Sequence, residues 1–477
     1  MADTGANPFV AIGRRQRVAI IAVFAIYLVL IAVARTQDPT PTVDWIPAAL
    51  LLLIALTVAP FFFLRKTLGW FHPLVFGAFL RLVDLLRRFD MYSWGLDWHR
   101  ALPLKNDELS DLIELQLLLY SLSVAAMYLG YFLGPKIPVP RLRFVEPRYL
   151  VSRLLIVFGV AFLAFVFYIA RQGGLSSHIG TWAGGRHGQI AGQHYQFMLV
   201  QLGIPACWVW LAFRRSAIRS PLFWAAALVT LAQSFLLTGS RGTGVYAVVV
   251  GLIIWMIRER RVSYVRVIAL GVVALYALTV LGSFRRSGWY GEPTWDSATD
   301  SSFVDTVVGG AKGELAERST NADGALPILA KVPDEVPLLW GSSYVAILTL
   351  PIPRGLFPEK PTMVDGRVGR VFFHVDAGVP AGGVGEAYWN FHIPGVFAVY
   401  FLFGIFQRWL ARGFLRNPTQ PAVIAMYASA ILLFREPSGL LLVQWLLVQV
   451  PLLAILIGVG ALRFGSAPSR LPMIVPK

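Results

Sequence analysis

The sequence has little charge and almost no cysteine for its length. Asp, Glu, Lys and Arg together make up 14% of its 477 residues, whereas hydrophobic residues make up 56%. This composition excludes an ordinary soluble domain and is typical of a protein that crosses a membrane several times. The single cysteine, Cys207, lies in an apolar run, so an intrachain disulfide is excluded and a small core side chain is expected.

Nucleotide-binding and metal-binding motifs are also missing. The chain has no phosphate loop with the Gly-Lys-Ser or Gly-Lys-Thr ending, which argues against ATP-driven transport. The inner loops are too short for a nucleotide-binding domain, which argues against a nucleotide-sugar donor. The spacing of His178, His187 and His194 fits no tight metal site, so we expect no metal and no cofactor.

The charge that is present is mostly positive. There are 42 Lys and Arg residues against 26 Asp and Glu residues, a formal net charge of +16. The cations lie between apolar runs and not along one soluble face, which argues against a nucleic-acid partner. Because Lys and Arg are enriched in the cytoplasmic loops of membrane proteins, the positions of these cations indicate which loops are cytoplasmic.

Apolar runs of roughly 20 residues, long enough to cross a bilayer, recur along the chain. If segment 68–86 also crosses or re-enters the membrane, the basic clusters of the short loops all fall on the cytoplasmic side, as expected. The chain then has about 12 crossings, and both termini are cytoplasmic. Segment 68–86 contains Arg81 and Asp84, which lie one helical turn apart and are spaced to pair. The expected spans are 18–34, 46–64, 68–86, 112–133, 149–170, 196–213, 220–238, 243–257, 267–283, 393–410, 420–434 and 439–462.

This topology divides the chain into four parts. Residues 1–283 are expected to form an N-terminal transmembrane bundle. Residues 284–392 form a long outer loop, rich in Gly, Pro and acidic residues, that we expect to fold as short helices capping the bundle. Residues 393–463 supply the C-terminal transmembrane helices, and 464–477 form a loose cytoplasmic tail. The predicted fold class is an all-α polytopic membrane protein with a helical outer cap.

Several cations fall on the outer face, against the general pattern. Arg354 and Lys360 lie in the segment Pro351-Ile352-Pro353-Arg354-Gly355-Leu356-Phe357-Pro358-Glu359-Lys360-Pro361, where four prolines fix the backbone. Arg241 lies in a Thr-Gly-Ser-Arg-Gly turn between two spans, and Arg435 lies between two others. Charges at a membrane boundary are costly unless they are paired or functional.

An arginine guanidinium matches phosphate oxygens with two parallel hydrogen bonds, so these outer cations, with Arg318, predict a diphosphate-lipid site. A simpler interpretation stands beside each of them. Arg435 is placed to pair with Glu436, Arg241 to anchor a span at the interface, and Arg354 to stabilise a carbonyl of the proline-rich turn.

A glycine-flanked segment at 382–395 directly precedes an expected span. Aromatic rings and an amide suit the binding of a sugar, and a carboxylate there is a candidate general base for an acceptor hydroxyl. The simpler interpretation of that carboxylate is an acidic residue that complements a helix N-terminus. His374 and His392 are alternative bases. The segment contributes four candidate site residues: Glu386, Tyr388, Asn390 and His392.

Three motifs in this order resemble bacterial O-antigen and oligosaccharide repeat-unit polymerases. They are Gly341-Ser342-Ser343-Tyr344, the proline-rich segment from Ile352 to Pro361, and Gly385-Glu386-Ala387-Tyr388-Trp389-Asn390-Phe391-His392-Ile393-Pro394-Gly395. The Thr-Gly-Ser-Arg turn at 238–241 and the late Arg435 are also similar, so the resemblance covers 235–440. The chain departs from the family at His392 and Glu436, where glycine is common.

The resemblance implies a glycosyltransferase of the GT-C type in the bacterial plasma membrane. Such an enzyme transfers a growing glycan from undecaprenyl diphosphate to an incoming lipid-linked repeat unit on the outer face, without a metal. The cations would stabilise the diphosphate leaving group, with Arg241 and Arg354 as the main catalytic candidates and Glu386 as the base. Implied partners are lipid-linked oligosaccharides and membrane lipids, and a chain-length regulator is a further candidate.

Two alternatives remain open. An O-antigen ligase belongs to the same enzyme class with another acceptor, and His374 would then be its candidate catalytic histidine. A transporter of lipid-linked glycans belongs to a different class and predicts charged residues deep within the spans. Apart from Arg81 and Asp84, the expected span interiors are nearly free of charge, which favours the enzyme.

Overall fold

The structure is a computed structural model, and it describes most of the chain. The described residues are 12–36, 45–64, 68–93, 102, 104, 108–139, 143–180, 194–238, 241–260, 265, 267–269, 271–272, 276, 280, 324–349, 352, 356–357, 359–375 and 378–463.

Helices account for nearly all of the regular structure in this part of the chain. The first half contains α1 (Arg14–Arg35), α2 (Ile46–Val58), α3 (Pro60–Phe63), η1 (Gly69–Phe71), α4 (Pro73–Arg87), α5 (Phe89–Ser93), α6 (Leu109–Leu133), α7 (Leu150–Arg171), α8 (Leu175–Gly180), α10 (His194–Val200), α11 (Gly203–Phe213), η5 (Arg215–Arg219), α12 (Pro221–Thr238) and α13 (Arg241–Glu259). The second half contains α17 (Ala325–Lys331), α18 (Ser342–Thr349), α19 (Val364–Phe372), α20 (Gly382–Arg416), α21 (Pro421–Ser429), η6 (Ala430–Phe434) and α22 (Gly439–Gly458). One short antiparallel pair, β1 (Arg143–Phe144) with β2 (Leu462–Arg463), joins two loops.

Among the described residues, 8 helices are long and apolar enough to cross a membrane, by length and composition. This confirms the predicted class, an all-α membrane protein. The candidate spans are Arg14–Arg35, Ile46–Phe63, Leu109–Leu133, Leu150–Arg171, Gln196–Phe213, Gly242–Glu259, Gly382–Arg416 and Leu441–Gly458.

The other four expected spans have a different form or lie outside the described part. Segment 68–86 corresponds mainly to α4, whose 15 residues extend roughly 22 Å, short of a hydrocarbon core of about 30 Å. Segment 420–434 divides into α21 and η6, and 220–238 corresponds to α12. Most of 267–283 lies outside the described residues. The count of about 12 crossings therefore stays a prediction.

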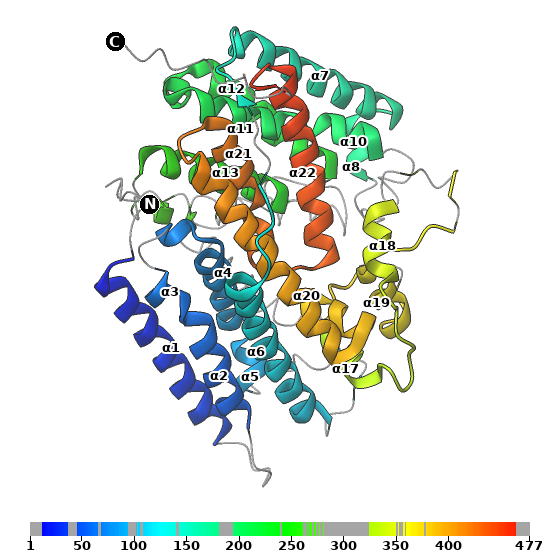
Figure 1. Ribbon diagram of the computed structural model, residues 1–477. Coiled ribbons are helices and arrows are strands. Elements are labelled where there is room, and N and C mark those ends of the chain that lie inside the picture. Colours follow the sequence, from blue (N-terminus) through cyan, green and yellow to red (C-terminus); the bar gives the residue numbers. More distant parts are fainter. Residues whose placement is uncertain are drawn as a thin grey trace.

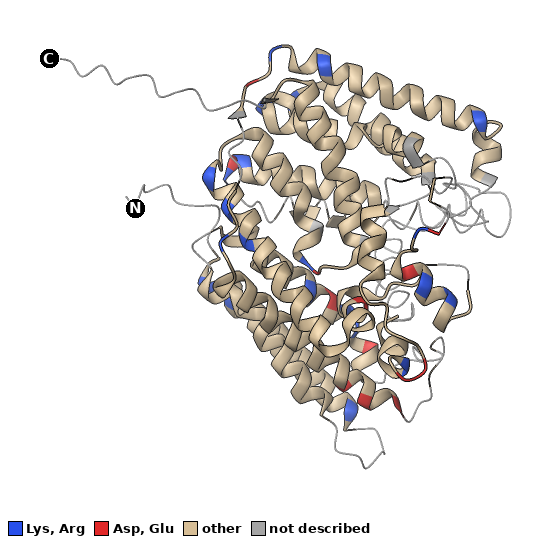
Figure 2. Ribbon diagram, turned by 45° about the vertical axis from the view of Figure 1, so that its right-hand side comes forward, with Lys and Arg blue, Asp and Glu red and all other residues tan. Residues whose placement is uncertain are grey.

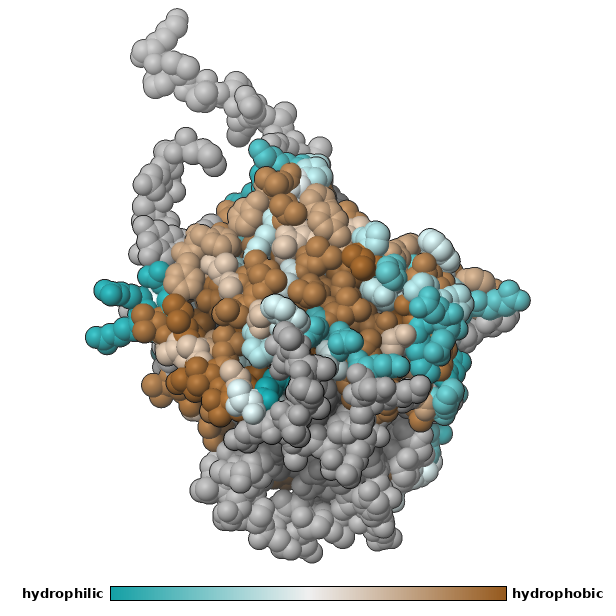
Figure 3. Space-filling view, turned by 90° about the horizontal axis from the view of Figure 1, so that it is seen from below, coloured by the Kyte–Doolittle hydropathy of each residue, from teal (hydrophilic) through white to brown (hydrophobic). Residues whose placement is uncertain are grey.

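The exposed surface of the long helices is unusually apolar. On α1, Val18, Ile26 and Val29 are each more than half exposed, and Ile156 and Leu163 on α7 are exposed to a similar extent. Brown, hydrophobic atoms cover much of the face seen in Figure 3. Charged residues gather at helix ends and in a mixed group near the middle of the molecule (Figure 2). Exposed apolar surface of this extent indicates contact with lipid.

The helices pack around two core clusters, which Figure 1 shows as a lower and an upper group. The lower cluster joins α1, α2, α4 and α6 to the short helices α17 and α19. The upper cluster joins α7, α11, α13, α21 and α22. Helix α20 belongs to both, since Tyr400 lies in the lower cluster and Phe414 in the upper one. It therefore joins the two groups, as does η6, which has Leu433 in the lower cluster and Phe434 in the upper one.

Close backbone approach holds α20 against α6. A methyl group on Gly404 would overlap the carbonyl of Met127, and one on Gly130 would overlap the carbonyl of Phe401. Small residues at facing positions let membrane helices approach in this way. The same device brings α4 onto η6, because a methyl group on Gly77 would overlap the carbonyl of Phe434.

Helix α20 is interrupted at Phe391 and His392, whose φ angles are −144° and 58°. Pro394 follows, and a proline removes a donor and crowds the carbonyl four residues earlier. The carbonyls of Trp389 and Asn390 instead accept hydrogen bonds from the amides of Leu339 and Trp340, at 3.0 and 3.2 Å. The interruption lies where the sequence places the boundary between the outer loop and the C-terminal spans.

Candidate functional site

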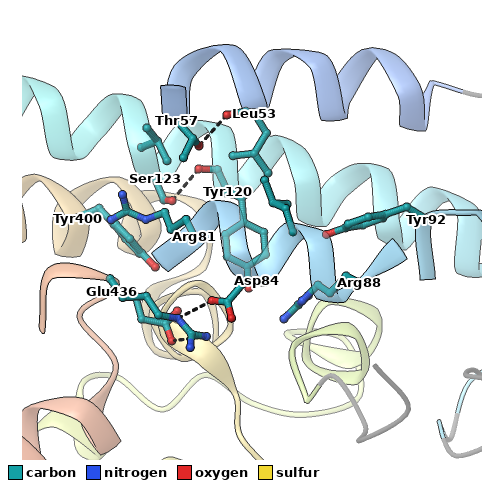
Figure 4. A pocket seen from close by; sticks show the side chains of 13 residues that line it. Leu53, Thr57, Arg81, Asp84, Arg88, Tyr92, Tyr120, Ser123, Tyr400 and Glu436 are labelled. Carbon is teal, nitrogen blue, oxygen red and sulfur yellow. Dashed lines mark hydrogen bonds and ion pairs between the residues drawn. The ribbon is translucent and has the colours of Figure 1, made fainter. Parts of the chain in front are cut away.

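A small cavity of about 50 Å³ lies where α2, α4, α6, α20 and the segment after η6 meet (Figure 4). Its lining combines three arginines and two carboxylates with three tyrosines, an unusual set for the interior of an apolar helix bundle. The lining residues are Leu53, Thr57, Arg81, Asp84, Leu85, Arg88, Tyr92, Tyr120, Ser123, Val124, Tyr400, Arg435 and Glu436.

One face of α4 and its C-cap residue supply three of the five charged groups. Arg81, Asp84 and Arg88 recur at intervals of three and four residues, so they lie on one side of the helix. The close contact of Gly77 with the carbonyl of Phe434 places this face beside the residue that follows, Arg435. Arg88 was not among the predicted site residues, although its spacing from Arg81 and Asp84 could have identified it.

Arg435 links α4 to the start of α20 through two carboxylates. Its Nε lies 2.8 Å from Asp84 Oδ2, and its Nη2 lies 3.3 Å from Glu436 Oε1. The other oxygen of Glu436 accepts a hydrogen bond from the Gly383 amide at 3.0 Å. The predicted pairing of Arg435 with Glu436 is therefore confirmed. Asp84 is a second and closer partner of Arg435.

The predicted pairing of Arg81 with Asp84 is wrong. The ion-pair partners of Asp84 are Arg435 and, at 3.8 Å, Arg87. The guanidinium of Arg81 instead turns toward α6, where its Nη2 lies 3.1 Å from the thioether sulfur of Met127. Its Nη1 is buried and has no hydrogen-bond partner. A thioether is a weak acceptor, so the charge of Arg81 is poorly compensated.

A second buried network surrounds Glu386, whose side chain is 0% exposed. Its Oε1 accepts a hydrogen bond from Ser343 Oγ at 2.7 Å, and its Oε2 accepts one from the Gly439 amide at 2.5 Å. Asn390 donates to Ser343 Oγ at 2.8 Å and accepts from the Gly341 amide at 2.8 Å. The network thus joins α18, α20 and α22, and both oxygens of Glu386 already have donors.

The simpler interpretation of Glu386 placed it at the N-terminus of the span that follows it in sequence. The structure instead bonds it to the N-terminus of α22, which begins at Gly439 and lies far from Glu386 in sequence. The first amides of a helix have no partner within it and carry the positive end of its dipole. Glu386 satisfies one of these amides and so joins α20 to α22.

Two further site residues lie at the interruption of α20. Tyr388 Oη lies 2.7 Å from His392 Nε2, and their rings are 4.4 Å apart between centroids. His374, the alternative base, is exposed.

The structure describes the side chains of only two predicted diphosphate ligands. Arg435 lies in the cavity, and Lys360 Nζ donates to the carbonyl of Ile352 at 3.1 Å. Arg241 begins α13, but its side chain lies outside the described part, as do Arg318 and Arg354 entirely. Whether these five cations meet therefore stays a prediction.

Asp365 joins the short helices to the start of α20. Its Oδ1 accepts a hydrogen bond from the Ala381 amide at 3.3 Å, and its carbonyl accepts one from the Val379 amide at 3.0 Å. Burial raises the pKa of this carboxyl to about 6, with the charge of Glu436 acting in the same direction and the Ala381 amide opposing it.

No protein-family model, curated protein or solved structure matches this chain.

Proposed function

We propose that the protein is a glycosyltransferase of the bacterial plasma membrane that uses a polyprenyl-diphosphate-linked oligosaccharide as donor. In this proposal the chain crosses the membrane about 12 times with both termini cytoplasmic, and 284–392 lies on the outer face. The growing glycan moves from undecaprenyl diphosphate to the non-reducing end of an incoming lipid-linked repeat unit.

The proposal is supported mainly by hydrogen bonds between two of the motifs that carry the resemblance. Ser343 of the first motif donates to Glu386 of the third, and Asn390 of the third donates back to Ser343. The Gly341 amide bonds to the same asparagine. Residues that resemble a polymerase in sequence thus form one hydrogen-bonded unit, and the Gly439 amide, four residues after Arg435, joins it.

Each predicted residue has a role in the transfer. The acceptor hydroxyl attacks the anomeric carbon, and the bond to the diphosphate breaks with its electron pair remaining on the diphosphate. Cations neutralise this leaving group, and a base takes the hydroxyl proton. Glu386 is the proposed base, with Tyr388, Asn390 and His392 as sugar contacts. The proposed diphosphate ligands are Arg241, Arg318, Arg354, Lys360 and Arg435.

The test is polymerisation in vitro from lipid-linked repeat units, with the products separated on a gel. We expect Arg241→Ala and Arg354→Ala to lose chain elongation, because each removes a charge from the leaving-group site. The matched control is Arg370→Ala, which removes an exposed arginine of α19 that bonds to the Gly366 carbonyl. Wild-type elongation by both site variants would exclude the assignment of the site.

Polymerase and ligase are separated by the glycans that a deletion strain accumulates. Loss of a polymerase leaves single lipid-linked repeat units, whereas loss of a ligase leaves lipid-linked polymer.

The cavity favours one second candidate, a transporter of lipid-linked glycans. Tyr120 lies roughly 16 Å along α6 from Leu109, and Ser123 lies roughly 15 Å from Leu133. The charged cavity is thus near the middle of a candidate span, where transporters bind their substrates. Movement of lipid-linked oligosaccharide across proteoliposomes that contain the protein, without elongation, would replace the enzyme with this candidate.

A further inference from the structure

Within the described part of the chain, Arg81 is a cavity cation that forms no ion pair with a carboxylate. Asp84 and Glu436, the two carboxylates of its lining, both pair with Arg435. Among the described residues, Arg81 Nη2 has the sulfur of Met127 as its hydrogen-bond partner, and the buried Nη1 has none. A partly buried cation without a counter-charge is unfavourable, so this site favours the binding of an anion.

The chemistry of the lining points to an oxyanion. The planar guanidinium of Arg81 offers two donors that match the oxygens of a phosphate group. Figure 4 shows Arg81 and Tyr400 on the same side of the cavity, so the tyrosine hydroxyl is a second donor there. Thr57 and Ser123 already donate to backbone carbonyls, at 2.7 Å each, which leaves their oxygens as acceptors.

The size of the cavity limits the ligand. Its volume of about 50 Å³ exceeds the roughly 10–15 Å³ that a cavity needs to hold one water molecule. It therefore has room for a small polar group such as a phosphate. The bound group is therefore small, or it is the end of a larger molecule.

We propose that this cavity binds one phosphate group, with Arg81 as its anchor and Tyr400 as a further donor. The phosphate comes either from a lipid headgroup that enters between the helices or from free phosphate in solution. Arg435, a proposed diphosphate ligand, lines the same cavity. The test nevertheless uses probes without a glycan and variants of Arg81 and Tyr400, which have no role in the proposed transfer, so its failure would leave the proposed enzyme activity untouched.

The experiment uses the full chain, purified in maltoside detergent and stripped of lipid. Inorganic phosphate and dioleoyl phosphatidic acid are titrated separately, and the midpoint of thermal unfolding is followed. Native mass spectrometry counts the lipid that stays bound. We expect at least one probe to raise the midpoint. Arg81→Gln should weaken binding by about tenfold or more, as expected for the loss of a hydrogen bond between charged groups.

The matched control is Arg408→Gln. Arg408 is also a partly buried arginine, but its guanidinium already bonds to the carbonyls of Phe132 and Gly134. This change should leave the affinity for both probes unaltered. If Arg81→Gln fails to fold, Arg81→Lys and Tyr400→Phe take its place, since the first keeps the charge and the second removes one hydroxyl.

Each outcome decides the proposal. A response to both probes that depends on Arg81 supports it with free phosphate as a source, and a response to the lipid alone identifies a headgroup. No response from the wild-type protein, or equal affinity in the wild type and the site variants, overturns it.

Discussion

Removal of the Glu386 carboxylate should destabilise the contact between α18, α20 and α22. The change Glu386→Ala deletes the acceptor of the Ser343 hydroxyl and of the Gly439 amide. A hydrogen bond to a charged group contributes about 1.5–3 kcal/mol in soluble proteins, whereas bonds between membrane helices average about 0.6 kcal/mol. Because two donors lose their acceptor in a fully buried place, we expect a loss of about 2–4 kcal/mol in the free energy of unfolding.

The change Glu386→Gln separates positioning from proton transfer. The amide oxygen still accepts from Gly439, while the amide nitrogen faces Ser343, whose hydroxyl can turn to accept it. We expect a smaller loss of stability, about 1–2 kcal/mol, because one donor changes partner. A base would lose elongation almost completely with Gln, whereas a positioning residue would retain part of it.

The assay is denaturant unfolding of the purified variants, with elongation measured on the same preparations. Glu335→Ala is the control, since Glu335 forms an exposed pair with Lys331 at 3.5 Å, and such a pair contributes about 1 kcal/mol or less. If Glu386→Ala unfolds at the same denaturant concentration as the wild type, the assigned hydrogen bonds do not hold these helices together.

Three further predictions follow from the same contacts. Gly439→Ala should cost about 1–3 kcal/mol of unfolding free energy, since its methyl group would lie 2.8 Å from a buried carboxylate oxygen; Gly413→Ala, in ordinary contact at 3.6 Å, should change little. The raised pKa of Asp365 favours folding while the carboxyl is protonated; this advantage is complete below about pH 4 and is lost as the pH rises through about 6. The unfolding free energy of the wild type should therefore fall relative to Asp365→Asn across that interval, and parallel pH curves would contradict the burial of this group. The double-mutant cycle of Asp84→Asn and Arg435→Gln should give a coupling above about 1 kcal/mol in denaturant unfolding, and additive effects would argue against their ion pair.

The sequence predicts the class of the fold because span length and hydrophobicity are local properties. The expected spans 18–34 and 46–64 correspond to α1 and to α2 with α3. Segment 68–86 shows the limit of such reasoning. Its length suggested a crossing, but α4 is short and packs through Gly77 on the backbone of η6, a contact that hydrophobicity alone does not encode.

The ion pairs of the site likewise depend on contacts between residues that are far apart in sequence. Spacing identified Arg81 and Asp84 as neighbours on one helix, and the natural prediction was that they pair. In the structure Arg435 takes the carboxylate of Asp84 from the far end of the chain, which leaves Arg81 to face Met127. Ion-pair partners depend on tertiary packing, so they cannot be read from spacing within a helix.

Glu436 is a departure from the family that the resemblance indicates, and its geometry gives the reason for an acid at this position. Glu436, just before α22, accepts a hydrogen bond from the Gly383 amide at the start of α20. Glu386 of α20 in turn accepts a hydrogen bond from the Gly439 amide at the start of α22. Each helix thus supplies a carboxylate for an N-terminal amide of the other, where such amides lack partners and an anion is favoured. Glycine at both amides permits the close approach, since a methyl group on Gly383 would lie 2.7 Å from the Tyr400 hydroxyl. The exchange also leaves Glu436 Oε1 for Arg435, so one carboxylate both joins two helices and holds the charge of the cavity in place.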